Sequence, residues 1–239
     1  MILAVLQARM SSTRLPGKVL RDLVGAPMLA RQVERLRRAE RIDRLVIATS
    51  DQPEDEPVAR LGADLGLGVH RGSLDDVLSR FIGALDAFGP AEHVVRLTGD
   101  CPLADPELID RLIALHVEQG TDYAHNTGDH RTFAHGLDAE VMRADALRTA
   151  HAEADESYER EHVTPFIYRR PDRFRLIVLK NGAEEGEARW TVDTPEDFAF
   201  VEAVYEGLYP ANPAFGSADV RRLVASRPDL AALGGFPRL

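Results

Sequence analysis

The chain has 239 residues, 44% of them hydrophobic, one cysteine and a formal net charge of −10 at pH 7. This charge disfavours a general nucleic-acid binder or an anionic-membrane binder, because both need a basic face that neutralises phosphates. No apolar run reaches the roughly 18 to 20 residues that span a bilayer and the start MILAVLQARM lacks signal-peptide features, so we expect a cytoplasmic protein of one domain, residues 1–239.

The first half of the chain alternates predicted strands with predicted helices. The apolar run 2–6 predicts a buried strand, the loop 7–18 follows it, and a helix is expected over 27–39. Further along we expect strands at 44–50, 67–70 and 93–97 and helices at 54–65, 73–85 and 106–119, with Ser73 as N-cap of the second of these helices. This order predicts an α/β fold, a mostly parallel central sheet with helices on both faces that binds ligands beyond the carboxyl ends of its strands.

The second half is less regular. Residues 121–142 are polar, with few apolar pairs, and we interpret them as an inserted substrate region. A helical stretch over 144–168, strands at 174–179 and 188–192, and a helix from Pro195 should follow. The tail 208–239, rich in Pro and Gly, is expected to close the fold or a subunit contact.

The loop QARMSSTRLPGK at 7–18 is the strongest local signal. Its turn can offer free backbone N–H groups, and Arg9, Arg14 and Lys18 add positive charge to it, features that suit a triphosphate. A solvated polar loop would explain any one of these cations better than it explains all three. The loop is neither a Walker A motif, since Val19 follows Lys18, nor a dinucleotide GxGxxG motif.

Two aspartates are predicted to lie directly after strands. LTGDCPL contains Asp100 and WTVDTPEDF contains Asp193. A turn or a helix cap would explain each of them, whereas the two together suit an oxygen-ligated Mg²⁺ that also holds substrate phosphates. The eight histidines show no helical zinc motif, and a single cysteine excludes a thiolate cluster.

QARMSSTRLPGKVL resembles the signature loop of the cytidylyltransferases that activate acidic sugars, most of all the branch of the spore coat polysaccharide biosynthesis protein F. This branch is related to the acylneuraminate and 3-deoxy-manno-octulosonate cytidylyltransferases. The resemblance runs from residue 2 to about residue 205, in motifs that keep the family's order. It implies a nucleotide-diphospho-sugar transferase fold (GT-A-like, Rossmann-like), a homodimer, and Mg²⁺-dependent transfer of CMP from CTP to a sugar or sugar acid with release of pyrophosphate.

The resemblance also implies roles for individual residues. Asp100 and Asp193 match the metal ligands and, with Arg9 and Lys18, make up the implied catalytic set. The nucleotide-binding residues would be Leu6, Ala8, Arg9, Arg14, Lys18, Arg71 and Ser73. The motifs FAHGLDAEVM and EREHVTPFIY resemble the acceptor side, with Gly136, Asp138, Glu140, His162 and Thr164 as the implied contacts.

The mechanism that these residues suggest is in-line attack by a sugar hydroxyl on the α-phosphorus, with the protein mainly positioning and neutralising charge. No dedicated base is evident, and Asp100 acting directly as a base is the alternative. A glycosyltransferase is a second hypothesis, although no Asp-x-Asp triplet occurs in the sequence. A nucleotide-sugar-binding protein without turnover is a third, although both carboxylates and the loop lysine are present.

Overall fold

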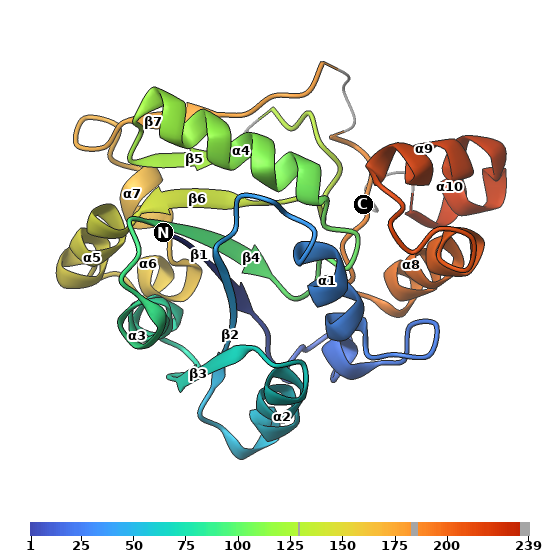
Figure 1. Ribbon diagram of the computed structural model, residues 1–239, viewed down its shortest axis with the longest axis horizontal. Coiled ribbons are helices and arrows are strands. Elements are labelled where there is room, and N and C mark those ends of the chain that lie inside the picture. The colour runs from blue at the N-terminus through green and yellow to red at the C-terminus, as the bar shows by residue number, and fades with distance from the viewer. Residues whose placement is uncertain (129, 183–185, 235–239) are drawn as a thin grey trace.

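The computed structural model describes residues 1–128, 130–182 and 186–234, and its centre is one seven-stranded sheet (Figure 1). The strand order is β3-β2-β1-β4-β6-β5-β7. The strands are β1 (Ile2–Gln7), β2 (Arg44–Ser50), β3 (Gly68–Gly72), β4 (His93–Thr98), β5 (Tyr123–His125), β6 (Glu140–Arg143) and β7 (Leu176–Val178). β6 pairs antiparallel with β4 and β5, and the other pairings are parallel, so the predicted α/β fold class is confirmed.

Helices cover both faces of the sheet (Figure 1). One face carries α1 (Met28–Leu36), α2 (Glu56–Asp64), α4 (Pro106–Gln119) and α8 (Pro195–Leu208), and the other carries α3 (Val77–Phe88), α5 (Ala144–Glu153) and α7 (Pro165–Tyr168). The remaining helices are η1 (Lys18–Leu20), η2 (Pro53–Asp55), α6 (Ser157–His162), α9 (Ser217–Ser226) and α10 (Pro228–Gly234). No helix in the described part of the chain is long and apolar enough to cross a membrane.

The central strand β1 explains why its sequence is apolar throughout. Ala4 and Leu6 belong to the core under α1 and α4, whereas Leu3 and Val5 belong to the core under α3 and α5. All four side chains are fully buried. Because successive side chains of a strand point to opposite faces, a parallel strand covered on both sides needs apolar residues at every position.

The helix α3 begins later than predicted, with a different N-cap residue. The N-cap is Asp76, whose carboxylate accepts a hydrogen bond from Ser79 N, and the helix begins at Val77. Ser73 instead accepts a hydrogen bond from Asp76 N at 3.0 Å, so the prediction of Ser73 as N-cap is wrong. Both residue types cap helices well, and only the register of the apolar face distinguishes them.

The second half of the chain contains three further corrections. The helix expected over 144–168 is divided into α5, α6 and α7, with a break at Val163, which adopts a positive φ of 73°. The strand expected over 188–192 is reduced to one bridge between His135 and Arg189. The segment 121–142 is not irregular throughout, because it contains β5 and most of β6; residue 129 lies outside the described part.

The C-terminal segment packs against the sheet domain through helices. α8, α9 and α10 contact one another and lie together at one end of the molecule (Figure 1). From α1, the buried Arg35 donates to Ala104 O at 2.8 Å and to Phe215 O at 2.9 Å, and it stacks on the Phe215 ring. Residues 235–239 of the predicted tail 208–239 lie outside the described part.

A histidine pair, the buried His116 and the half-buried His93, joins β4 to α4 and should make stability depend on pH. His116 is fully buried, with Nε2 3.0 Å from His93 Nδ1 and Nδ1 3.0 Å from Thr121 Oγ1. Burial, with the neighbouring His93 as the next cause, lowers the pKa of His116 from 6.5 to about 4. The unfolded chain therefore binds a proton that the folded chain does not, and the free energy of unfolding should fall as pH drops from about 6.5 to about 4.

The expected loss from this one group is about 3 kcal/mol across that pH window. Urea unfolding of the wild type and of His116→Gln at several pH values would measure it. We expect the variant to be less stable at pH 7.5, where its buried amide cannot reproduce both hydrogen bonds, but to show a shallower pH dependence. The same pH slope in both proteins would rule out His116 as the titrating group.

Candidate active site

A tight loop after β1 presents the first group of site residues. Gly17 N and Ser12 N both donate to Met10 O, at 3.0 and 2.9 Å, and Met10 N donates to Asp55 Oδ1 at 2.6 Å. Gly17 has a φ of 69°, a conformation that glycine adopts at little cost, and the chain turns there into η1. This turn directs Lys18, the first residue of η1, inward, where only 8% of it is exposed.

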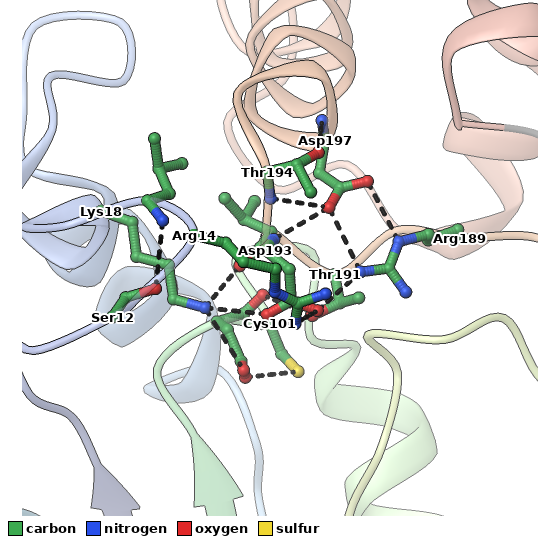
Figure 2. A network of polar contacts seen from close by, with 12 residues as sticks. Ser12, Arg14, Lys18, Cys101, Arg189, Thr191, Asp193, Thr194 and Asp197 are labelled. Atoms are coloured by element: carbon green, nitrogen blue, oxygen red, sulfur yellow. Dashed lines mark hydrogen bonds and ion pairs between the residues drawn. The ribbon is translucent and has the colours of Figure 1, made fainter. Parts of the chain in front are cut away.

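Lys18 joins its own loop to two distant segments through its amine (Figure 2). Nζ donates to Val192 O at 2.6 Å and to Asp193 Oδ1 at 3.1 Å, and it lies 3.6 Å from Asp100 Oδ2. Val192 N also donates to Asp100 O at 2.8 Å, which ties the end of β4 to the segment before α8. The two predicted strand-end aspartates therefore meet on either side of one buried cation.

Asp193 is surrounded by positive charge (Figure 2). Its Oδ2 lies 2.6 Å from Arg189 Nη2 and 3.2 Å from Arg14 Nη2, in addition to the contact with Lys18. Burial by itself would raise the pKa of the Asp193 carboxyl, but the charge and hydrogen bond of Lys18, with Arg189 and Arg14, hold the pKa below its ordinary value. Asp193 is therefore anionic near neutral pH.

Arg189 and Asp197 hold Asp193 in position, although neither was assigned to the site from the sequence. Arg189 contacts both Asp193 and the buried Asp197, and Asp197 Oδ2 accepts from Asp193 N at 3.0 Å. Asp197 and Thr194 form a capping box at the start of α8. The Thr-x-x-Asp spacing is a sequence signal for that box, but no local pattern links Arg189 to it.

Asp100 lies at the end of β4 with one oxygen directed to its own strand. Thr98 Oγ1 donates to Asp100 Oδ1 at 2.6 Å, and Cys101 Sγ lies 3.4 Å from the same oxygen. Burial, with the charge of Asp100 as the next cause, raises the pKa of the Cys101 thiol well above its ordinary value. Cys101 is thus a buried neutral thiol rather than a nucleophile.

A cavity of about 350 Å³ opens above these groups. Among the predicted nucleotide-binding and catalytic residues, its lining includes Ala8, Arg9, Arg14, Lys18, Asp100 and Asp193. Several further lining residues were not predicted from the sequence, among them Gln7, Arg80, Arg96 and Thr98. A polar residue such as Arg96 inside the apolar strand 93–97 was a usable signal, because a buried strand accepts one only where it faces a ligand or a partner.

Three predicted nucleotide-binding residues do not line this cavity. Leu6 is fully buried in the core. Arg71 donates to Ser50 O at 3.1 Å and to Gln52 O at 2.9 Å and pairs with Glu56, so it holds the turn after β2. Ser73 serves the turn before α3. The structure thus gives Arg71 and Ser73 local structural contacts.

A second cavity of about 690 Å³ adjoins the first and shares Arg96, Thr98 and His162 with it. The predicted acceptor residues Asp138, Glu140, His162 and Thr164 line it. Asp138 makes a two-pronged ion pair with Arg131, at 2.6 and 3.0 Å. The predicted acceptor side is therefore brought together beside the first cavity.

Glu140 is the most constrained acidic group of the second cavity. It pairs with Arg96 and accepts hydrogen bonds from Tyr123 OH and, at 2.8 Å, from Thr164 Oγ1. Burial raises its pKa, but the charge of Arg96 and these hydrogen bonds outweigh burial and hold the pKa below its ordinary value. Arg96 and Glu140 thus form a fixed ion pair at the junction of the two cavities.

Gly136, also predicted on the acceptor side, has a different role. It does not line the cavity; at a φ of 100°, a Cβ there would lie 2.4 Å from Thr191 N and 2.5 Å from Trp190 C. The absent side chain lets Trp190 N donate to His135 O at 2.6 Å. Gly136 therefore sets the path of the segment that carries Asp193.

Gly136→Ala should lower the free energy of unfolding by about 2–4 kcal/mol, because the new methyl group adds a backbone clash to an unfavourable φ. Gly66→Ala is the matched control: its φ is 70°, but no atom lies within 4 Å of a new Cβ. It should cost only about 1 kcal/mol. Urea unfolding of both variants separates the two effects, and equal losses would show that φ alone matters at Gly136.

The fold is that of nucleotidyltransferases. A solved cytidylyltransferase from Leptospira borgpetersenii serovar Hardjo-bovis has a TM-score of 0.92 and 28% identity, covering 100% of this chain and 98% of that one. A CMP:2-keto-3-deoxy-manno-octonic acid synthetase, solved in complex with CTP, shares the fold with a TM-score of 0.65 and 18% identity, over 86% of this chain and 98% of its own.

The chain belongs to the cytidylyltransferase family, whose model matches residues 3–212. The spore coat polysaccharide biosynthesis protein SpsF of Bacillus subtilis is 36% identical over 237 residues, which cover 96% of this chain and 96% of SpsF. The resemblance drawn from the loop 7–18 and the later motifs is therefore confirmed at the level of the family and its branch.

Proposed function

We propose that this protein transfers CMP from CTP to a sugar or sugar acid and releases pyrophosphate, in the synthesis of precursors for surface polysaccharides. The observation that carries the proposal is the meeting of Asp100 and Asp193 around Lys18, under a cationic loop and in the wall of the first of two adjoining cavities. The names of the relatives agree with this reaction, since one was solved with CTP and another is a polysaccharide biosynthesis protein.

The first cavity has the charge pattern that a triphosphate needs. Arg9 and Arg14 are exposed on the loop, and 62% of the Arg14 side chain is accessible, so both can turn to phosphate oxygens with little rearrangement. The buried Lys18 is held in place by Val192 O. In this proposal the three cations neutralise the phosphates and stabilise the leaving pyrophosphate.

The donor set fits Mg²⁺ that arrives with its nucleotide. Within the described residues no group of three or more His, Cys, Asp or Glu side chains could hold a metal alone. Mg²⁺ commonly takes one or two carboxylates and completes its shell with phosphate oxygens and water, which suits Asp100 and Asp193. When bound, the ion would add positive charge beside the α-phosphate and the attacking oxygen.

The second cavity is the proposed acceptor site. Its polar wall, with Asp138, Glu140 and Thr164, can orient sugar hydroxyls, while Ile177 and Val178 supply an apolar wall. His162 lines both cavities and so lies where the acceptor meets the nucleotide. The chain would thereby align a sugar hydroxyl with the α-phosphorus, and positioning supplies much of the rate enhancement.

Pyrophosphate release from each of the four ribonucleoside triphosphates tests the proposal. The panel of acceptors should contain nine-carbon and smaller sugar acids and neutral sugars, each assayed with Mg²⁺ and with a chelator in its place. Release that requires CTP, one acceptor and the metal is the expected result. Binding of CTP without release for any acceptor would favour a non-catalytic nucleotide-binding protein instead.

A further inference from the structure

A buried arginine in the first cavity makes no side-chain hydrogen bond within the part of the chain that the structure describes. Arg80, on α3, is 2% exposed, and its Nε and Nη1 atoms are buried without a hydrogen bond. Across the described residues it forms no ion pair. Burial, and after it the charge of Arg9, lower the pKa of Arg80. An unpaired guanidinium in such a place is costly, which indicates that a ligand completes it.

Arg80 reaches the cavity from a different element than the triphosphate cations. Arg9, Arg14 and Lys18 lie on the loop after β1, whereas Arg80 comes from α3 and lines the cavity beside the apolar Val77. Gln7, at the end of β1, lines the same cavity, and its Oε1 is also buried without a partner. An apolar side chain with an amide and a guanidinium suits the flat face and polar edge of a base better than phosphate.

The parallel donors of a guanidinium limit which nucleobase fits beside Arg80. Arginine offers parallel N–H donors that match two adjacent acceptors. Cytosine presents O2 and N3, which are both acceptors. Uracil has a donor at N3, and the pairing edges of adenine and guanine also place a donor beside an acceptor. A fork of N–H groups therefore attracts cytosine and repels the N3–H of uracil.

We propose that Arg80 is the residue that selects cytosine, donating to O2 and N3 of the base, with the Gln7 amide beside it. This inference rests on the proposed use of CTP and assigns the choice of base within that site. It moves base selection away from Arg71, whose side chain is occupied by Ser50 O, Gln52 O and Glu56.

Arg80→Met and Arg80→Lys test the assignment, with Arg111→Met on the exposed side of α4 as the control. Titrations of CTP, UTP and inorganic tripolyphosphate, with and without Mg²⁺, give the affinities independently of turnover. We expect both Arg80 variants to lose about 10- to 100-fold of the preference for CTP over UTP, because the fork is gone in each. Tripolyphosphate should bind to them as it does to the wild type.

Thermal unfolding separates this role from a structural one. Without nucleotide, Arg80→Met should unfold at the same temperature as the wild type or a higher one, since the substitution removes an unpaired buried charge. Equal losses of affinity for CTP and UTP, or weaker binding of tripolyphosphate, would overturn the assignment and make Arg80 a phosphate contact. A lowered unfolding temperature of Arg80→Met would also overturn it and give Arg80 a structural role. A wild type without preference for CTP would instead refute the proposed function itself.

Discussion

Asp193→Asn should reduce kcat by roughly a thousandfold or more while the chain remains folded. The amide has nearly the shape of the carboxylate but carries no charge, so it is a poor ligand for Mg²⁺. Stability should fall by only about 1–2 kcal/mol, because the cations around Asp193 keep other partners. Lys18 retains Val192 O and Asp100, and Arg189 retains Asp197.

The matched control is Asp105→Asn. Asp105 is also a buried aspartate before a helix, where it accepts from Glu107 N and Leu108 N as the N-cap of α4, but it lines neither cavity. Asparagine caps helices about as well, so this variant should retain kcat. Steady-state rates at increasing Mg²⁺ concentrations would show whether Asp193→Asn needs more metal. Near-normal turnover by a folded Asp193→Asn protein would exclude Asp193 as a metal ligand.

Most of the parallel half of the sheet could be predicted from the sequence, because its strands and helices follow local patterns of apolar residues. Strand 44–50 and helix 106–119 have the predicted bounds, since each has a continuous apolar pattern and clear ends. The strand expected over 188–192 does not form, because its backbone bonds go to Asp100 O and His135 O instead of a neighbouring strand. Those partners lie far away in the sequence, so no local pattern could indicate them.

The candidate site shows the same division. Lys18, Asp100 and Asp193 were found because each lies at a strand end or in a motif, and the structure brings them together. Arg189 and Arg80 were not found, because their importance depends on contacts, or on missing contacts, that only the folded chain reveals. Arg71 stood in a suggestive motif, yet its donors are used by the turn after β2.

Lys18→Met should lower kcat/KM by roughly a hundred- to a thousandfold, the loss typical of removing one preorganised electrostatic contact. Methionine fills much the same space but leaves Asp100 and Asp193 facing each other without the cation between them. Arg14→Met provides the contrast: 62% of the Arg14 side chain is exposed, so its ion pair should add less than about 1 kcal/mol to stability.

The pH dependence of unfolding tests whether Lys18 stabilises the fold through its charge on Asp193. The folded chain holds the pKa of Asp193 below its ordinary value of 3.8, so this carboxylate stabilises the fold above that pH and the contribution is lost as pH falls through the folded value. Lys18 is the largest of the charges that lower this pKa. The wild type should therefore exceed Lys18→Met in stability at pH 7, by a margin that shrinks below about pH 4. A stability margin that does not change with pH would mean that Lys18 acts through packing and its hydrogen bond to Val192 O. A Lys18→Met variant that loses stability but keeps kcat/KM would exclude Lys18 from the chemistry.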